Sequence, residues 1–438
     1  MEAAGSAVLV SPEAAVSSAF EVAGAVKNVA IVGFGTVGRS VAKILCGDSG
    51  SSLRLTHVIN RNVERKRVDW APADVVWSDD FNAALAPDID IVVELIGGLH
   101  PAKELVQSAL HAGKSVVTAN KQLIATYGPE LFERARTAGL TIAYGASVCG
   151  GMPVLPALGA GLGGDRIVEI KGILNGTCNY ILSRVENEGI SFADALAGAQ
   201  ALGYAESDPT DDVEGLDARA KLVILVRTAL RREVNVSDIP ARGIGGVQPV
   251  DFVYAKRIGC TIRQISRARS DGQAVAAWVQ PALVRLSSAA GTLQGSRNVV
   301  VTTGEFGGDN VFSGFGAGGD PTAVAVVSDL VAIANGGSRL TINDEVQQAK
   351  VAPDYHSAFY VRFVIDDQPG ILAALATVFA RHGINIDSVL QERGFERKQL
   401  PFVITLERCA NSQLHAALKE IATLQHLVEK PLALPILD

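Results

Sequence analysis

Short apolar runs alternate with segments of helical spacing over the first third of the chain. Continuous apolar runs of this length are typical of parallel strands that are buried on both faces, with a helix in each connection. We therefore expect an α/β architecture with a doubly wound parallel sheet over residues 27–150. The expected strands are Val29–Val32, Leu53–Ile59, Ile89–Leu95, Ser115–Thr118 and Thr141–Tyr144.

The middle of the chain has a mixed pattern that predicts an α+β domain over residues 151–320. A glycine- and proline-rich passage, Gly145–Gly164, leads into it. Pro321 then lies in the first turn of an apolar helix, where its missing N–H is tolerated. We expect this helix, within residues 321–343, to return to the first domain. The other expected elements are strands Ile167–Ile173, Val275–Val279 and Asn298–Thr303, a helix over Tyr180–Glu188 and a long helix that ends near Leu230.

The pattern changes again after an expected linker over residues 344–357. Strands and helices then follow in the order βαββαβ within about 80 residues, which is the order of a ferredoxin-like module. We interpret residues 358–438 as a separate module whose last strand, Leu427–Leu437, forms an edge of its sheet. The other strands are expected at Phe359–Ile365, Ile384–Leu390 and Pro401–Glu407, and the helices at Ile371–His382 and Ser412–Thr423.

Three glycines follow the first strand directly and predict a dinucleotide site of the Rossmann type. Gly33, Gly35 and Gly38 form the pattern G-x-G-x-x-G, and a helix-like segment runs from Thr36 to about Leu45. The first glycine permits a tight turn, the second lets the backbone approach a pyrophosphate, and the third lets helix and strand pack closely. The N-terminus of the helix offers free N–H groups to the anion.

The end of the second expected strand bears on which dinucleotide binds. Leu53–Ile59 is followed by Asn60, Arg61 and Asn62, with no acid to bind a ribose 2′-hydroxyl. Arg61 can instead pair with a 2′-phosphate. The sequence therefore favours NADP(H), with NAD(H) as an accepted alternative. The competing interpretation is that Arg61 is only a solvated loop charge.

An acidic segment in the middle of the chain supplies candidate chemistry. Asp217 and Lys221 are four positions apart, so in a helix they lie on one face, one turn apart. A lysine beside a carboxylate can move a proton, and the acids before it can hold an ammonium group. The alternative is a solvated acidic loop before a helix with an ordinary ion pair. The six carboxylates within twelve residues are Glu206, Asp208, Asp211, Asp212, Glu214 and Asp217.

Composition limits the class of protein. The 438 residues are 48% hydrophobic and 19% charged, which is enough for two or three domains with large cores. The net charge is −7, and the sequence has no block of basic residues of the kind that binds nucleic acids. No apolar run approaches the length of a membrane span. The five cysteines form no C-x-x-C pair, which favours a reduced, cytoplasmic setting. Residues 1–26 contain no Lys or Arg, and we expect a flexible N-terminal extension there.

Taken together, these motifs resemble homoserine dehydrogenase with a C-terminal ACT domain. The resemblance rests on GFGTVG, VVELIGG, VVTANK, NGTCNYIL, LGYAESDPTDDVEGLDARAK, GAGGDPTA and DDQPGILAAL, in the order of the family. It implies reversible oxidation of L-homoserine to L-aspartate 4-semialdehyde with NAD(P), in threonine and methionine biosynthesis. It also implies a middle domain that binds substrate and dimerises, so that a homodimer or homotetramer is expected.

The resemblance also implies roles for individual residues. Lys121 would lie near the nicotinamide and the substrate. Glu206 and Asp212 would hold the amino-acid end of the substrate or order the residues that do. Asp217 and Lys221 would form the proton-transfer pair, although Lys121 competes with Lys221 for the proton. The cofactor would be held by Gly33, Phe34, Gly35, Thr36, Val37 and Gly38.

A monovalent cation such as Na⁺ is a further implication of the resemblance. Its ligands would be backbone carbonyls of Gly145, Val148, Gly150 and Met152. Many relatives have Glu where Gly145 stands and a small residue where Cys149 stands. Backbone ligation is compatible with both changes.

The C-terminal module suggests regulation by an amino acid. The loop Asp366–Gly370 precedes a helix N-terminus that can bind a carboxylate. Asp367 and Asn385 could bind an amino group beside Gly370, and the resemblance points to threonine as the effector. The alternative is that the module only dimerises the enzyme by strand pairing.

Two other functions are compatible with parts of the sequence. Aspartate-semialdehyde dehydrogenase would need a thiolate to trap an acyl group, and Cys178 follows a strand end. A non-catalytic, amino-acid-sensing regulatory protein would keep the C-terminal module without the chemistry. The presence of Lys121, Asp217 and Lys221 argues against the second.

Overall fold

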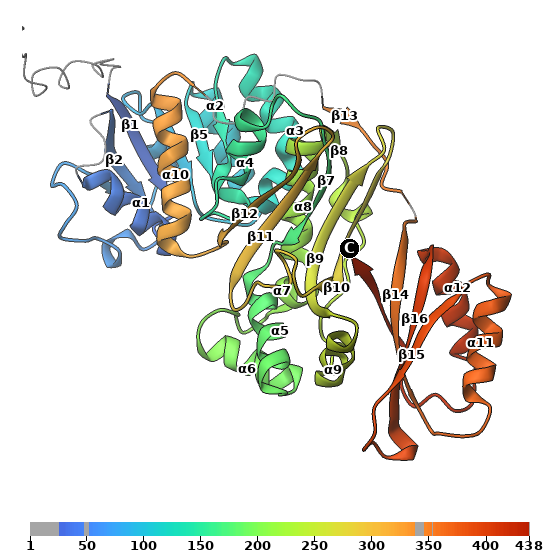
Figure 1. The fold of residues 1–438 in the computed structure, drawn as a ribbon. Coiled ribbons are helices and arrows are strands. Elements are labelled where there is room, and N and C mark those ends of the chain that lie inside the picture. The colour runs from blue at the N-terminus through green and yellow to red at the C-terminus, as the bar shows by residue number, and fades with distance from the viewer. Residues whose placement is uncertain (1–25, 48–51, 338–345, 353, 438) are drawn as a thin grey trace, which may run out of the picture.

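The computed structural model describes residues 26–47, 52–337, 346–352 and 354–437 (Figure 1). The expected N-terminal extension, apart from Val26, lies outside these residues, as do parts of the expected returning helix and linker. Within the described part of the chain, no helix is both long enough and apolar enough to cross a membrane.

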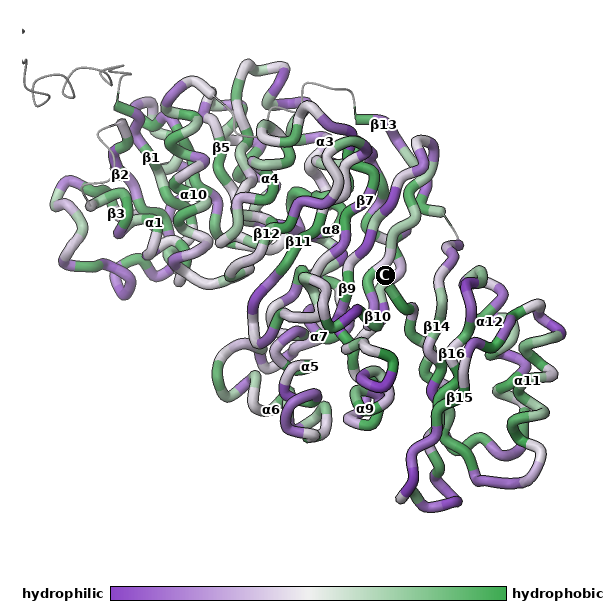
Figure 2. The backbone as a smooth tube through the Cα atoms, viewed as in Figure 1, coloured by the Kyte–Doolittle hydropathy of each residue, from purple (hydrophilic) through white to green (hydrophobic). Residues whose placement is uncertain are grey.

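The first sheet confirms the predicted doubly wound architecture. Its six strands are all parallel and lie in the order β3-β2-β1-β4-β5-β6. The order reverses between β1 and β4, which is where ligands bind in such sheets. Figure 2 shows hydrophobic residues along β1 and hydrophilic residues in the outer loops. The strands are β1 Lys27–Val32, β2 Leu53–Ile59, β3 Val76–Ser78, β4 Ile91–Glu94, β5 Ser115–Thr118 and β6 Ile142–Ala143.

Helices cover this sheet on both faces. The helix α10 packs beside α1, so the expected returning helix does contact the first domain (Figure 1). The helix α10 begins at Gly319, and Pro321 lies in its first turn, as the sequence predicted. The helices are α1 Thr36–Cys46, α2 Ala102–His111, α3 Lys121–Thr137 and α10 Gly319–Ala334.

A second, mixed sheet has nine strands, in the order β12-β11-β7-β9-β10-β17-β14-β16-β15, and β8 Arg232–Glu233 pairs with β13 Gln347–Gln348 in a small sheet of their own. The first part of the nine-stranded sheet comes from the middle of the chain, with β7 Ile167–Ile173, β9 Cys260–Ser270, β10 Val275–Arg285, β11 Arg297–Gly304 and β12 Gly308–Phe315. The accompanying helices are α5 Gly176–Glu188, α6 Phe192–Ala201, α7 Thr210–Val213, α8 Leu216–Leu230 and α9 Pro249–Arg257. The helix α8 is almost entirely buried, which brings its functional side chains into the interior.

The C-terminal module has the predicted βαββαβ order and ferredoxin-like strand arrangement β17-β14-β16-β15. Its strands are β14 His356–Ile365, β15 Ile386–Gln391, β16 Leu400–Ala410 and β17 Leu432–Leu437, and its helices are α11 Ile371–Arg381 and α12 Asn411–Ile421. Both helices contact each other and pack on one face of the module's sheet (Figure 1).

The prediction that the last strand is an edge strand is wrong. The strand β17 pairs with β14 on one side and in parallel with β10 on the other, so it joins the module to the middle of the molecule. Pro435 cannot donate to a ladder and suits an edge. The pairing with β10 uses only the two residues after this proline, Ile436 and Leu437. The module is therefore not a separate body.

A buried ion pair reinforces this junction. Arg362 on β14 donates to Asp251 on α9 at 2.6 Å, and Tyr360 donates its hydroxyl proton to the same carboxylate at 2.7 Å. Arg362 is 4% exposed and Asp251 is 0% exposed. A buried carboxylate without its cation is strongly destabilising, so the middle domain and the module depend on each other for stability.

We predict that Arg362→Met lowers the free energy of unfolding by about 3–5 kcal/mol, because it leaves Asp251 buried without a cation. The exposed pair of Arg381 and Glu420 offers a matched control, and Arg381→Met should change stability by about 0–1 kcal/mol. Urea unfolding followed by two spectroscopic probes measures both. Equal effects of the two substitutions would contradict the dependence of the junction on this pair.

Candidate active site

The turn after β1 fits a dinucleotide through the predicted glycines. Gly33 has φ +104°, and a Cβ there would lie 2.6 Å from the carbonyl oxygen of Leu95. A Cβ on Gly38 would lie 2.1 Å from the carbonyl oxygen of Gly33. A Cβ on Gly35 would meet nothing within 4 Å, so this glycine faces open space at the start of α1. The open space beside a helix N-terminus is where a pyrophosphate would bind.

Phe34 has a different role from the glycines around it. Its side chain is fully buried against Trp77, with ring centroids 5.0 Å apart. Its N–H donates to the side-chain oxygen of Asn60 at 2.9 Å. Phe34 therefore ties the glycine turn to the end of β2, directly before Arg61. The side chains of Arg61 and Thr36 are exposed, and that of Val37 is half-buried.

A buried network connects the ends of β4 and β5. Glu94 is 0% exposed; one of its carboxylate oxygens accepts from the N–H groups of Ile96 and Gly97, and the other accepts from the hydroxyl of Thr118 at 2.6 Å. Asn120 donates to the carbonyl oxygen of Gly98 and caps α3. Lys121, the first residue of α3, is held at the carboxyl edge of the sheet by this network.

Lys121 meets the predicted pair on α8 at one carboxylate. Asp217 accepts from Lys221 at 2.7 Å, as the spacing predicted, and from Lys121 at 2.9 Å through its other oxygen. Asp217 and Lys221 are 9% and 8% exposed, whereas the Lys121 side chain is 35% exposed. The helices α3 and α8 thus each contribute a lysine to one buried anion.

Asn175 completes the cluster and was not predicted as a site residue. Its side-chain nitrogen donates to Asp212 at 2.6 Å and to Asp217 at 3.0 Å. Lys221 donates to the carbonyl oxygen of Leu174 at 2.8 Å. Asn175 also caps α5. An asparagine between a strand and a helix predicts a cap, but the cap uses its oxygen and leaves the amide free for the carboxylates.

The charges in this cluster support one another. Burial alone would raise the pKa of Asp217, but the ammonium groups of Lys221 and Lys121 hold this pKa well below its usual range. Burial would lower the pKa of Lys221, but the Asp217 carboxylate raises it above its usual value. Burial also raises the pKa of Asp212, despite its hydrogen bond from Asn175. The structure therefore holds Lys221 in its ammonium form and Asp217 as carboxylate.

The other acids of this segment are dispersed. Glu206 is exposed, and its backbone oxygen accepts from Gln200. Asp208 bonds to Thr210 in the same turn, and Asp211 accepts from Gln122 at 3.4 Å. Of the six predicted carboxylates, Asp212 and Asp217 are the two that meet around Asn175.

The loop predicted to hold a cation is tightly packed. The N–H of Gly145 donates to Asp329 on α10 at 2.8 Å, and a Cβ at this glycine would lie 2.8 Å from the same carboxylate. Cys149 has φ +49°, and the N–H of Met152 donates to its carbonyl oxygen. Val148 is buried, and Gly150 packs on Thr322 of α10. Among the described residues, no group of three His, Cys, Asp or Glu side chains could hold a metal.

Cys178 does not have the environment of a nucleophile. It is fully buried, and its thiol donates to the carbonyl oxygen of Asp212 at 3.1 Å. Burial raises its pKa well above the usual range, and the carboxylates of Asp212 and Asp217 act in the same direction. A thiolate is therefore disfavoured, which removes the chemical basis for the aspartate-semialdehyde dehydrogenase interpretation.

The loop before α11 borders a cavity of about 310 Å³. Gly370 has φ +96° and is the N-cap of the helix. The N–H of Asp367 donates to the carbonyl oxygen of Arg397, and Asn385 donates to Glu407. Asp367 and Asn385 are thus held by neighbouring residues, and neither lines this cavity, whereas Gly370 does. The lining residues are Ile365, Pro369, Gly370, Ile371, Ala374, Leu375, Leu424, Gln425, His426 and Leu427.

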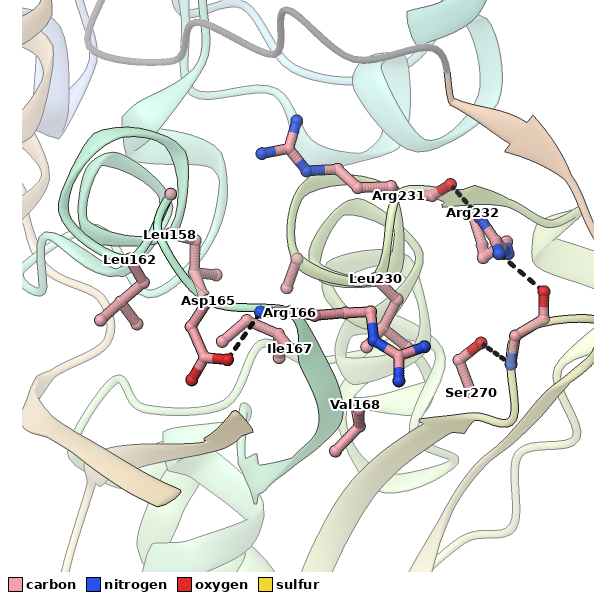
Figure 3. A pocket seen from close by; sticks show the side chains of 13 residues that line it. Leu158, Leu162, Asp165, Arg166, Ile167, Val168, Leu230, Arg231, Arg232 and Ser270 are labelled. Carbon is pink, nitrogen blue, oxygen red and sulfur yellow. Dashed lines mark hydrogen bonds between the residues drawn. The ribbon is translucent and has the colours of Figure 1, made fainter. Parts of the chain in front are cut away.

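A different cavity, of about 280 Å³, lies at the far end of α8 (Figure 3). Leu230, the last residue of α8, lines it, together with Asp165 and Arg232. Asp217 is thirteen residues earlier in the same helix, or about 20 Å away along its axis. This cavity is therefore separate from the lysine–carboxylate cluster.

Comparison with known proteins gives the same assignment over most of the chain. The model of the homoserine dehydrogenase NAD-binding domain matches residues 33–145, that of homoserine dehydrogenase residues 153–331, and that of the ACT domain residues 359–426. The chain is 37% identical to homoserine dehydrogenase of Synechocystis over 434 residues, covering 94% of this chain and 99% of the relative. It is 41% identical to that of Mycobacterium tuberculosis over 382 residues, covering 83% and 86%.

Solved structures agree. A homoserine dehydrogenase from Thiobacillus denitrificans has a TM-score of 0.86 at 32% identity, covering 94% of this chain and 98% of that one. A hyperthermophilic archaeal homoserine dehydrogenase in complex with NADPH has a TM-score of 0.60 at 26% identity, covering 72% and 99%. With its dinucleotide turn and its lysine–carboxylate cluster, the chain therefore belongs to the homoserine dehydrogenase family of NAD(P)-binding oxidoreductases and carries an ACT domain at its C-terminus.

Proposed function

We propose that Asp217, Lys221 and Lys121 orient the substrate and move the proton in the reversible oxidation of L-homoserine to L-aspartate 4-semialdehyde. The observation that carries this proposal is the single buried carboxylate that binds one lysine from α3 and one from α8. When bound, the nicotinamide supplies the acceptor for the hydride. The residues of this chain must then remove the hydroxyl proton and exclude water.

Lys221 is the proposed proton carrier. Asp217 keeps it as an ammonium group, and two of its three N–H bonds go to Asp217 and to the carbonyl oxygen of Leu174. The third can donate to the carbonyl oxygen of the semialdehyde during reduction. In the direction of oxidation, Lys221 must first lose a proton, which its raised pKa opposes. Lys121, which is more exposed, is the competing carrier.

Asp212 is the proposed partner of the substrate ammonium group. It is half-buried and already oriented by Asn175. Burial raises its pKa, and an ammonium group beside it would lower this pKa again, so the two groups would favour each other's charged forms. Glu206 is exposed and would act during the approach of the substrate.

For the cofactor, we propose a preference for NADP(H). The end of β2 presents Arg61 to solvent, and Asn60 is fixed by the N–H of Phe34. A guanidinium at this position can pair with a 2′-phosphate. For the cation, we propose that Asp329 contributes negative charge beside the carbonyls of Gly145, Val148, Gly150 and Met152, since its carboxylate lies where a side chain at position 145 would be.

We also propose the domain division 27–150, 151–320, 321–343, 344–357 and 358–438, a homodimer or homotetramer, and threonine as an effector. The cavity beside Gly370 and the N-terminus of α11 support an amino-acid ligand. Because β17 joins the ACT domain to β10, a ligand there can act on the catalytic part without a flexible linker.

Lys221→Ala should lower the turnover number by a factor on the order of 10² or more, because it removes the proton carrier, with a much smaller change in the KM for homoserine. Steady-state kinetics in both directions measure this, with Lys256→Ala on the exposed side of α9 as the control. Added ethylamine should restore part of the activity of Lys221→Ala. Near-normal turnover of Lys221→Ala would assign the proton to Lys121. So would rescue by ethylamine of Lys121→Ala but not of Lys221→Ala.

Arg61→Ala should raise the KM for NADP⁺ more than the KM for NAD⁺, because only NADP⁺ carries the 2′-phosphate. The control is Arg54→Ala. It removes another exposed arginine of β2, which pairs with Asp74, and should leave the ratio of the two KM values unchanged. Equal effects of Arg61→Ala on the two cofactors would show that Arg61 does not meet the 2′-phosphate.

Threonine should bind the full chain and lower its activity. Ala374→Trp should abolish this inhibition, because the position is exposed and lines the cavity beside Gly370, so the new ring fills the cavity. Ala380→Trp is the control on the exposed side of the same helix. Calorimetry and inhibition kinetics measure the effect. No threonine binding to the full chain would leave dimerisation as the role of the ACT domain.

A further inference from the structure

A cavity of about 670 Å³ lies between the middle domain and the ACT domain. One wall comes from β10 and from residues 240–242, which run beside it. The other comes from α12 and from the segment that leads into β17. This volume is in the range of sites that hold small organic molecules. The lining residues are Pro240, Ala241, Arg242, Trp278, Val279, Gln280, Tyr355, Asn411, His415, Leu418, Lys419, Ala422, Lys430, Pro431 and Ala433.

The charges of this junction cavity all have one sign. Arg242, Lys419 and Lys430 line it, together with His415, and no carboxylate does. Each of the three cations is exposed. Within the described residues, none of the three forms a salt bridge with a carboxylate. The protein as a whole carries a net charge of −7, so this concentration of positive charge is not a general property of its surface.

Arg242 has the position expected of a ligand-binding group. One guanidinium nitrogen donates to the carbonyl oxygen of Ala433 on β17 at 2.6 Å, which leaves other N–H groups for a ligand. Surrounding protein lowers its pKa by desolvation, yet solvent reaches the side chain. A group in the wall of a concave site is both partly desolvated and accessible to solvent, as Arg242 is.

Apolar and aromatic groups form the rest of the wall. Trp278 and Tyr355 have ring centroids 5.6 Å apart, and the hydroxyl of Tyr355 accepts from Gln280 at 2.6 Å. Leu418 and Ala422 face the cavity from α12. Such a surface suits the apolar body of a ligand, with its anionic group among the cations.

The wall of the junction cavity is directly connected to the active site. The N–H of Arg242 donates to the carbonyl oxygen of Val279, and two residues later the N–H of Ile244 donates to the carbonyl oxygen of Val213. Val213 ends α7 and follows Asp212, the acid oriented by Asn175. A ligand that changes the position of Arg242 therefore acts on the segment that carries Asp212.

We propose that the junction cavity binds a small organic anion, a phosphate or carboxylate with an apolar body, and that its occupation changes the turnover of homoserine. This site is distinct from the cavity beside Gly370, with which it shares no lining residue. The cavity of Figure 3 is a weaker candidate, because Arg166 is paired with Glu305 and Arg232 is bonded to Gly272.

Calorimetry on the full chain with phenyl phosphate, phenylacetate and inorganic phosphate tests the binding. At least one of the two aromatic anions should bind about tenfold more tightly than inorganic phosphate, because it also fills the apolar wall. The better of the two identifies the anionic group. The double substitution Lys419→Gln and Lys430→Gln should weaken this binding about tenfold or more. The matched control, Lys256→Gln with Lys398→Gln, removes two exposed lysines elsewhere and should leave binding unchanged.

Arg61→Ala separates this site from the dinucleotide site, since it should not affect binding of the aromatic anion. The same anion should change homoserine turnover in the wild-type chain and in the control, and not in the Lys419→Gln, Lys430→Gln variant. Absence of saturable binding would overturn the proposal. Binding that is insensitive to the two lysines, or that is lost with Arg61→Ala, would also overturn it.

Discussion

The carboxylate of Asp217 is the charge on which the arrangement of the catalytic part depends. It lies in the interior and binds an ammonium group from α3 and another from its own helix. Burying a carboxylate without a cation costs several kcal/mol, so its two lysine partners stabilise this interior. Because Lys121 follows β5 of the first sheet and Lys221 lies on α8 in the middle of the chain, the same ion pairs connect these two parts of the molecule.

The local parts of this site could be predicted from the sequence. Asp217 and Lys221 are one helical turn apart, and the three glycines follow a buried strand, so short-range geometry was sufficient. The contact between Lys121 and Asp217 joins residues 96 positions apart, and the residues alone contain no signal for it. Phe34 shows a second limit of prediction from the sequence. It lies within the glycine motif, yet its buried ring and its bond to Asn60 depend on neighbouring strands.

The fold shows the same distinction between local and long-range information. Most strands were predicted, because continuous apolar runs indicate burial on both faces. The final strand has such a run too, but its partner β10 lies about 150 residues earlier, and Pro435 is compatible with an edge. Its central place makes the ACT domain part of one continuous sheet. The Asp251–Arg362 pair connects the ACT domain to the middle domain, and the hydrogen bond from Ile244 to Val213 connects the middle domain to the segment that carries Asp212.

Asp217 keeps Lys221 charged in the interior. The pKa of Lys221 tests this, measured from the chemical shift of its side chain in lysine-labelled protein and assigned with Lys221→Arg. Lys221 is expected to titrate above the usual range for lysine in the wild-type chain, and Asp217→Asn should lower this pKa because the largest opposing effect to burial is then removed. A Lys221 that titrates below the usual range while Asp217 is intact would contradict the role of Asp217.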